Sequence, residues 1–238
     1  MVTVISLGGS IVAPGEVDVS FLAEFRSLVG EFLERDENRR FILVVGGGGP
    51  ARVWQNACRE IVASVPDEEA DWIGIMATRL NAQLVKAVMG PWCTQPVVTD
   101  PTQGRIDGAQ TSPQEGTFAG RVLVASGWKP GFSSDYDAVL LAERFHAAVV
   151  INLSNIKQVY TGDPRKDSNA KPIDAISWDD FRALVGDEWT PGKNVPFDPV
   201  ASRHGAQLGL KVICAAGRDL PNLRLILEGK PFIGTIIG

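Results

Sequence analysis

The sequence predicts an α/β protein in which a mostly parallel sheet is covered by helices. Short apolar runs alternate along the chain with longer stretches in which apolar residues recur every three to four positions. Several of the short runs, such as 2–7 and 147–153, are almost entirely apolar, as is typical of strands that are buried on both faces. With 238 residues, the chain can form one large domain of this class or two small lobes.

The composition excludes several classes of protein. Hydrophobic residues make up 45% and charged residues 21%, which indicates a globular chain rather than a disordered one. A net charge of −5 without a Lys/Arg block argues against nucleic-acid binding, but it allows local positive potential for a small anion. Two histidines and three scattered cysteines argue against a zinc site and favour reduced, buried thiols. Because the chain lacks a signal peptide and a long apolar span, we expect a soluble cytoplasmic protein without membrane contact.

The apolar pattern places seven strands and several helices. Between the first two strands, apolar residues from 21 to 33 recur at helical spacing, and Asp18 or Ser20 is a suitable N-cap. Pro50 suits the first turn of a second helix. The polar segment 99–117 is rich in turn formers, and we expect a loop or a mobile lid there. The expected strands are 2–7, 41–45, 96–98, 121–125, 147–153, 211–215 and 232–236, and the remaining helices are 71–89, 135–146 and 198–209.

Glycine-rich turns follow the first two predicted strands. After the first, Gly8, Gly9 and Ser10 can direct backbone N–H groups and a hydroxyl at an anion, although such a pair is often only a tight turn. After the second, GGGGPAR combines loop amides with a helix N-terminus, and Arg52 can reach a phosphate. A flexible connection is the alternative interpretation. Neither G-x-x-x-x-G-K-S/T nor G-x-G-x-x-G is present, so the loop is predicted to be neither a P-loop nor a dinucleotide-binding turn.

Two later segments also bear glycines and polar side chains. The stretch SGWKPGFSSDYDAVLLAE at 126–143 offers donors ahead of a helix and carries Lys129, but its serines are equally well explained as helix caps. The stretch NLSNIKQVYTGDPRKD at 152–167 follows a buried strand, where open α/β sheets bind ligands. There Tyr160 can flank a flat base and Asp163 can accept from a ribose, with a β-hairpin excursion as the alternative. With two histidines outside these loops, no Ser-His-Asp or Cys-His arrangement is indicated.

Taken together and in this order, these segments resemble the amino acid kinase superfamily, and within it the archaeal-type uridylate (UMP) kinases. GGS and VVGGGGPAR resemble the first two glycine loops of that family. DWIGIMATRLNAQLV resembles its helix D-x-I-G-I-x-x-S/T-R-x-N-A, which is the most specific of these motifs. VYTGDPRKDSNAKPI, FDPVASRHGAQLGLKVICAAG and GTIIG are similar to its nucleotide segment, its D-P-x-A helix and its last strand. The resemblance implies a three-layer α/β/α sandwich, one domain over 1–238, with an acceptor lobe at 1–146 and an ATP lobe at 147–238.

The resemblance also implies a reaction, ATP + UMP → ADP + UDP with Mg²⁺, in pyrimidine biosynthesis, by a homohexamer built from dimers. Such a transfer needs two anions held in line and their charge neutralised, which fixed N–H groups can do without reorganisation. No covalent enzyme intermediate and no metal-ligating side chain are implied. The implied ATP residues are Gly9, Ser10, Gly48, Arg52, Ser154, Asn155, Tyr160 and Asp163; the UMP residues are Gly47, Asp71, Gly127, Trp128, Lys129, Pro130, Gly131, Phe132, Ser133 and Ser134; and the catalytic residues are Arg52, Ser10 and Lys129.

The chain departs from the family pattern at three places. Ser6 stands where many members have a lysine, so we expect Lys129 or Arg52 to supply the missing charge. The acceptor loop G-G-T-H-P-G-H-T-T-D-A appears as SGWKPGFSSDYDA, and the turn V-D-G-V-Y appears as IKQVY. Two other interpretations therefore stay open. One is a kinase of this fold with another phosphomonoester or a carboxylate as acceptor, and the other is a non-catalytic nucleotide- or anion-binding protein.

Overall fold

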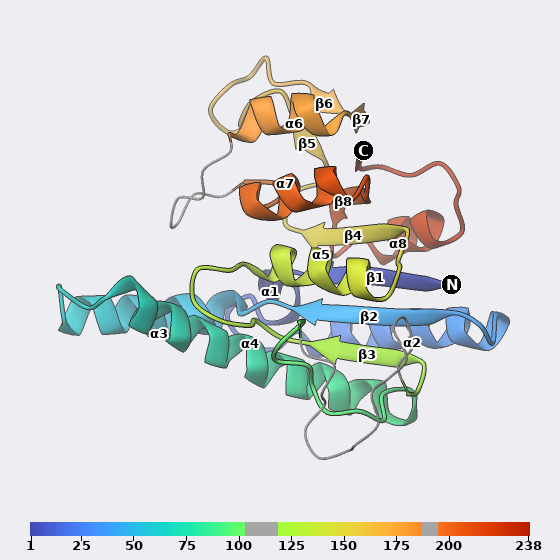
Figure 1. Ribbon diagram of the computed structural model, residues 1–238, viewed down its shortest axis with the longest axis horizontal. Helices are drawn as coiled ribbons and strands as arrows, with labels where there is room; N and C mark the ends of the chain where they lie inside the picture. The colour runs from blue at the N-terminus through green and yellow to red at the C-terminus, as the bar shows by residue number, and fades with distance from the viewer. Residues whose placement is uncertain (103–118, 187–194) are drawn as a thin grey trace.

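The fold is built on one long sheet. The computed structural model describes residues 1–102, 119–186 and 195–238. Within these ranges the strands are β1 (Val2–Leu7), β2 (Arg40–Val45), β3 (Val122–Ala125), β4 (Val149–Ser154), β5 (Val159–Tyr160), β6 (Pro172–Ile173), β7 (Ala175–Ile176), β8 (Lys211–Ala216) and β9 (Thr235–Ile237). Seven of the described strands form a sheet in the order β3-β2-β1-β4-β8-β9-β7, while β5 and β6 form a separate hairpin (Figure 1). All pairs of the large sheet are parallel except β8 with β9.

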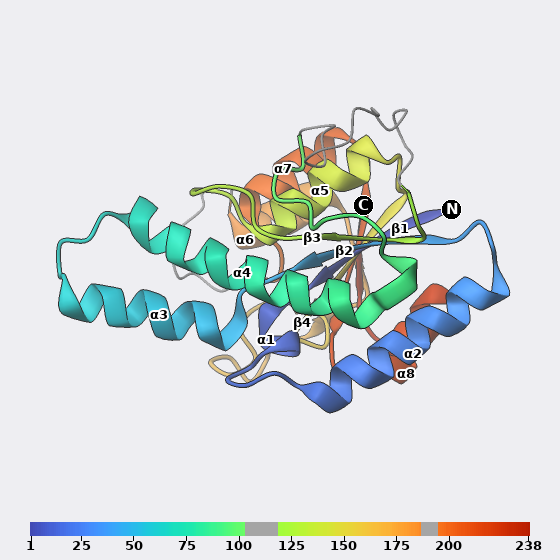
Figure 2. The same cartoon turned by 90° about the horizontal axis from the view of Figure 1, so that it is seen from below.

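Helices cover both faces of this sheet (Figure 2). One layer holds α1 (Gly9–Val12), α2 (Val19–Arg35), α3 (Gly48–Ile61), α4 (Asp67–Met89) and α8 (Leu220–Leu227). The other holds α5 (Ser134–Arg144), α6 (Trp178–Val185) and α7 (Pro199–Gln207). The 3₁₀ turn η1 (Gly90–Trp92) follows α4. In both views α3 and the start of α4 project beyond the sheet as a hairpin.

The strands divide their side chains between two cores. Ile42 and Val44 of β2 face the core under α5, α6 and α7, whereas Phe41 and Leu43 face the core under α2, α4 and α8. This alternation is the two-residue period of a strand, and burial on both sides explains why the strand sequences contain so few polar residues. The predicted three-layer α/β/α sandwich is therefore confirmed.

Several predicted boundaries shift in the structure. The expected strand 96–98 is wrong, because within the described residues Val98 makes only an isolated bridge to Ala125. The long helix begins at Asp67 rather than at residue 71, and its three acidic residues in the first turn complement the helix dipole. The expected lid at 99–117 falls mostly on 103–118, which lie outside the described residues. The cysteines are free thiols; Cys93 and Cys214 are buried as expected, whereas Cys58 is only half-buried, so the expectation is wrong for that residue.

Candidate functional site

The candidate site lies at the carboxyl edge of the parallel strands. Because β1, β2, β3 and β4 run in the same direction, the segments that follow them meet at one edge of the sheet (Figure 1). The loops after β1 and β2 touch there: a side chain on Gly9 would collide with the backbone of Gly46 and Gly48. Gly48 also has φ +68°, in the left-handed region that favours glycine. Two of the predicted loops therefore interlock through residues that must lack side chains.

A buried amide fixes the second of these loops. Asn81 of α4 is only 3% exposed, and its Nδ2 donates to the carbonyls of Gly46 at 2.9 Å and Gly47 at 3.0 Å. The N–H of Gly46 donates to the carbonyl of Leu7 at 3.0 Å. The carbonyls of Gly46 and Gly47 are thus turned into the protein. At the start of α3 the N–H of Gly49 donates to the carbonyl of Ala13 at 2.8 Å, so an anion at this helix end would meet the N–H groups of Gly47 and Gly48.

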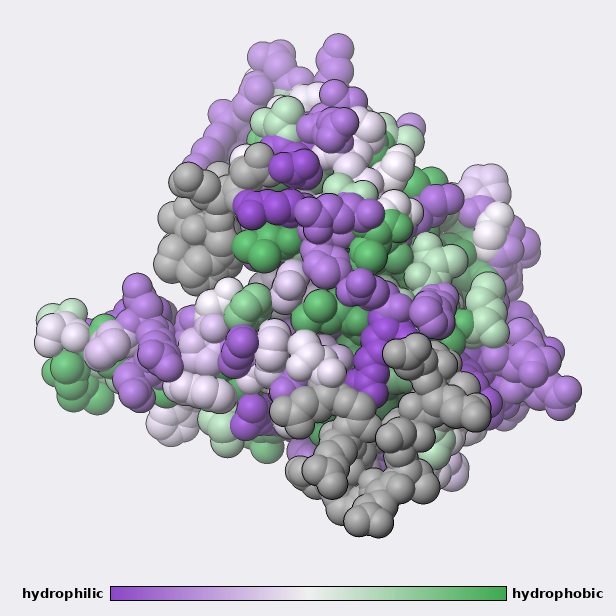
Figure 3. Space-filling model, viewed as in Figure 1, coloured by the Kyte–Doolittle hydropathy of each residue, from purple (hydrophilic) through white to green (hydrophobic). Residues whose placement is uncertain are grey.

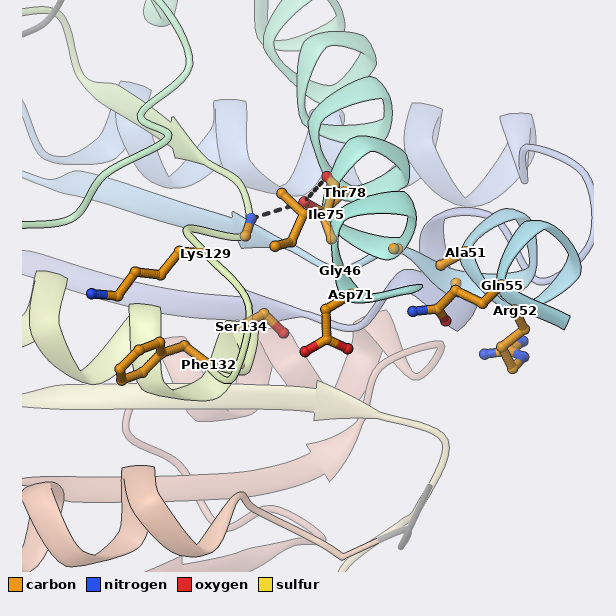
Figure 4. Close-up of a pocket in the computed structure, with 14 residues that line it drawn as sticks. Gly46, Ala51, Arg52, Gln55, Asp71, Ile75, Thr78, Lys129, Phe132 and Ser134 are labelled. Carbon is orange, nitrogen blue, oxygen red and sulfur yellow. Dashed lines mark hydrogen bonds between the residues drawn. The ribbon is translucent and has the colours of Figure 1, made fainter. Parts of the chain in front are cut away.

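Beside this edge, a pocket of about 270 Å³ opens between α3, α4 and the loop after β3 (Figure 4). Asp71, Gly74, Ile75 and Thr78 line it from α4, at the spacing that places residues on one face of a helix. The loop after β3 contributes Gly127, Lys129 and Phe132, and Ser134 begins α5. The second glycine loop and α3 complete the wall with Gly46, Gly47, Gly48, Ala51, Arg52 and Gln55.

Side chains of α4 hold the loop after β3 in place. Thr78 Oγ1 accepts from the N–H of Gly127 at 2.9 Å and donates to the carbonyl of Ile75 at 2.6 Å (Figure 4). Asp71 Oδ2 accepts from the N–H of Gly131 at 3.0 Å. The position of this loop therefore depends on residues 49 and 60 positions earlier in the chain.

The two predicted cations occupy opposite ends of the pocket. Arg52 is exposed on α3, and its Nη1 donates to Ser10 Oγ at 3.1 Å, which joins the two glycine loops. Lys129 Nζ lies 3.9 Å from the centroid of the Trp128 ring, a cation–π contact. Figure 4 shows the Lys129 side chain directed away from Asp71 and Ser134. The Lys129 ammonium group therefore contacts the rings of Trp128 and Phe132 and does not point into the pocket.

A carboxyl group faces Ser6, where many family members have a lysine. Ser6 is 2% exposed, and its Oγ donates to Asp135 Oδ1 at 3.1 Å. Asp135 Oδ2 accepts from the N–H of Asp198 at 3.2 Å. Burial, reinforced by the neighbouring Asp198, raises the pKa of Asp135 to about 7. We did not select Asp135 from the sequence, although it is the aspartate of the T-T-D-A motif in the acceptor loop.

The remaining residues predicted for the acceptor lie in the same loop but do not line the pocket. Trp128, Pro130 and Gly131 belong to this group. Ser133 is the N-cap of α5, with its Oγ accepting from the N–H of Tyr136 at 3.2 Å, so the helix-cap interpretation holds for this serine.

The residues predicted for the adenine nucleotide lie farther along the same edge. Ser154 ends β4, and its carbonyl accepts from the N–H of Gly217 at 2.8 Å. Asp163 is paired with Arg165 at 3.0 Å, and this hydrogen bond lowers the pKa of Asp163. Asn155 is exposed and Tyr160 lies in the β5–β6 hairpin, so none of these predicted residues lines the pocket beside α4.

The sequence contained a signal for the lining residues that we did not select. Gly74 and Thr78 belong to the same helical motif as Asp71, three and seven residues later. Helical spacing alone places them on the Asp71 face, whereas Gln55 lies on a different helix and enters the pocket only through tertiary packing.

Known proteins resemble this chain in sequence and in fold. Residues 1–215 match the family model described as the amino acid kinase family. The chain belongs to the amino acid kinase family. It is 34% identical over 235 residues to a uridylate kinase of Methanospirillum hungatei, covering 98% of this chain and 93% of that protein. A uridylate kinase of Thermoplasma volcanium is 31% identical over 235 residues, which cover 98% of this chain and 96% of that one.

The amino acid kinase fold is also seen in a solved relative. The crystal structure of uridylate kinase from Archaeoglobus fulgidus superposes with a TM-score of 0.80 at 30% identity, and the match covers 100% of both chains. The likeness therefore extends over the whole fold. None of the described helices combines the length and the apolar character that crossing a membrane requires.

Proposed function

We propose that this protein is a uridylate kinase, which transfers the γ-phosphoryl group of ATP directly to UMP. The observation that carries the proposal is the interlock of the glycine loops after β1 and β2 next to the pocket. Similarity to several uridylate kinases over nearly the whole chain supports the choice of substrates. We assign the acceptor to the lobe 1–146, which forms the pocket, and ATP to the lobe 147–238, which carries Ser154 to Asp163.

The pocket suits a small phosphorylated acceptor. Its volume is near the lower end of the range for small-molecule sites, so it accommodates one compact ligand. Asp71 supplies a carboxylate that can accept from hydroxyl groups, and Ser134 supplies a hydroxyl. The glycine loop at the entrance to α3 directs N–H groups at an anion, and the dipole of this 14-residue helix favours negative charge there.

The chemistry then rests on positioning and on charge. A loose transition state spreads negative charge over the transferring phosphoryl group, so the protein has to align donor and acceptor and neutralise that charge. The amides of the two interlocked loops are fixed before substrates bind, which keeps the reorganisation cost low. Arg52, next to Ser10, adds a full positive charge at the junction of the loops.

A magnesium ion that arrives with ATP fits the described residues. Among them, no group of three or more acidic, histidine or cysteine side chains could hold a metal by itself. Mg²⁺ in kinases is bound by one or two carboxylates together with substrate phosphates and water, so such a group is not needed. Asp135, which contacts Ser6 at the end of β1, is the carboxyl group that we assign to this role. When bound, the ion supplies positive charge to the phosphoryl oxygens.

We further propose that the protein works in the cytoplasm as an oligomer, with the hexamer of dimers that the family resemblance implies. The support is a set of exposed apolar side chains on α3 and α4, which we call the hairpin patch. Its members are highly exposed for apolar side chains: Trp54 67%, Ile61 82%, Met76 57% and Leu80 70%. Figure 3 shows hydrophobic residues gathered at the far end of this hairpin. A two-fold axis would bring two copies of the patch together.

An acceptor panel tests the proposed function. The purified protein is incubated with Mg²⁺ and ATP and with UMP, CMP, another phosphomonoester or a carboxylic acid, and ADP release is measured. We expect turnover with UMP. Turnover with a different acceptor alone would replace UMP by that compound, and ATP binding without turnover would support the non-catalytic interpretation.

A further inference from the structure

A buried carboxyl group lies behind the acceptor loop without a place in the proposed chemistry. Asp137 of α5 is 0% exposed. Its Oδ2 accepts from the backbone N–H of Trp128 at 3.2 Å, while its Oδ1 has no hydrogen-bond partner among the described residues. Burying a carboxyl group is costly and an unpaired buried oxygen adds to that cost, so such a group needs a compensating role.

The contact of Asp137 is one of two that hold the backbone of Trp128. On the other side of Trp128, the carbonyl accepts from Arg79 Nη2 at 3.4 Å. The preceding residue, Gly127, is held by Thr78 of α4. Helix α4 thus binds the loop from one side and α5 binds it from the other, through the N–H of Trp128.

The Trp128 ring contacts two residues that line the pocket, Lys129 and Phe132. This ring lies 5.1 Å from that of Phe132, which lies 5.0 Å from Tyr136 of α5. Lys129 Nζ is 3.9 Å from the Trp128 ring centroid and 5.0 Å from that of Phe132. Lys129 and Phe132 both line the pocket and contact the Trp128 ring, so a shift of the Trp128 backbone would displace both of them.

Asp137 needs no charge to hold the loop, because its Oδ2 accepts from the backbone N–H of Trp128 at 3.2 Å. Arg144, farther along α5, is directed at the carbonyl of Pro101. A neutral carboxyl group still accepts the Trp128 N–H through its carbonyl oxygen, as an asparagine amide would.

We propose that Asp137 is a positioning residue for the phosphate acceptor: by accepting the Trp128 N–H, it fixes the loop so that Lys129 and Phe132 line the acceptor pocket. The inference rests on the proposed function for the identity of the acceptor. It concerns a side chain that the family motifs quoted above do not include, because the residue two positions after the T-T-D aspartate is not part of them.

Two measurements on one set of variants test this role. Asp137→Ala removes the oxygen that accepts the Trp128 N–H, whereas Asp137→Asn keeps an oxygen at that place. Glu143→Ala is the control, because Glu143 lies on the same helix but contacts His204 and not the loop. We expect Asp137→Ala to raise KM for UMP about tenfold, the effect of losing one buried hydrogen bond. KM for ATP should change less than about twofold, and Asp137→Asn and Glu143→Ala should resemble the wild type.

Amide hydrogen exchange provides the readout that does not depend on catalysis. We expect faster exchange over 126–132 in Asp137→Ala and unchanged exchange in Asp137→Asn. If the wild-type protein does not phosphorylate UMP, the proposed function fails, whereas the exchange result still decides whether Asp137 anchors the loop. Unchanged exchange and unchanged KM for UMP in Asp137→Ala would overturn the inference, as would an equal loss in Asp137→Asn. Should Asp137→Ala not fold, Asp137→Ser, whose hydroxyl is too short to reach Trp128, takes its place.

Discussion

At the scale of single residues, Arg52 offers the most direct test of charge neutralisation. Its guanidinium group is exposed and donates to Ser10, so it can turn toward a phosphate without disrupting the packing of other side chains. We expect Arg52→Ala to lower kcat by about 10²–10³-fold, as removal of a transition-state donor does. The melting temperature should change little, because exposed charged groups add little to stability.

Steady-state kinetics and thermal unfolding measure these two effects. Arg59→Ala on the same helix is the matched control. Arg59 Nη2 lies 3.8 Å from Asp67 Oδ1, away from the glycine loops. A variant Arg52→Ala with full kcat would show that another group provides the positive charge.

The buried acids make stability depend on pH. The pKa of Asp137 is raised to about 8 and that of Asp135 to about 7, chiefly by burial, whereas an unfolded aspartate titrates near pH 4. Between these values the folded protein holds protons that the unfolded chain has released. The free energy of unfolding should therefore fall as the pH rises from about 4 to about 8.

Urea unfolding at several pH values measures this slope. Asp137→Asn removes one of the two groups, so its free energy of unfolding should fall less steeply than that of the wild type over the same range. Equal slopes for the two proteins would mean that the pKa of Asp137 is not raised in the folded state.

At the scale of elements, the interlock of the two glycine loops is predicted to resist any added side chain. In Gly9→Ala the new Cβ meets backbone atoms of Gly46 and Gly48, which cannot move aside as a flexible side chain would. We expect a loss of about 1–3 kcal/mol in the free energy of unfolding, the usual cost of overpacking, together with a large loss of activity. Urea denaturation measures the first effect. Gly15→Ala, where a Cβ meets nothing within 4 Å, should be close to neutral, and equal stability of both variants would argue against the interlock.

The elements that the sequence predicted well are those with a strong local pattern. The strands β1, β2, β3, β4 and β8 follow from apolar runs, whereas the short strand β7 was not predicted. Helix α2 follows from its apolar spacing and its Asp18 cap, whose side chain accepts from the N–H of Phe21. We did not predict α6 and α8, which have eight residues each, although Ser177 and Asp219 cap them. Helices this short contain too few turns for periodicity to stand out.

The candidate site was also predicted only in part, because some of its features have a local sequence pattern and others do not. The glycine loops follow from glycines that come directly after strands, and the resemblance supplied Asp71. The hydrogen bonds that shape the pocket join residues far apart in the chain, such as Thr78 with Gly127 and Asp71 with Gly131. No local pattern specifies such pairs, so the loop tethers and the burial of Asp137 emerged only from the three-dimensional arrangement.

At the scale of the whole molecule, the hairpin patch predicts self-association. Replacing Ile61 or Leu80 by Glu puts a charge at a side chain that is 82% or 70% exposed in the single chain and would be buried between copies. We expect Ile61→Glu and Leu80→Glu to lower the mass measured by size-exclusion chromatography with light scattering. Ile233→Glu, at a 57% exposed residue outside the hairpin, is the control. An unchanged mass in both hairpin variants would place the contact elsewhere.

The position of β1 in the interior of the sheet also has a consequence for how the protein is made. Its two hydrogen-bonding neighbours are β2, which follows soon after it, and β4, which begins only at Val149. During synthesis, the backbone groups of β1 that pair with β4 therefore stay unpaired until the chain has been extended past α5. An unpaired strand edge readily pairs with another chain, so nascent molecules should depend most on chaperones during this interval.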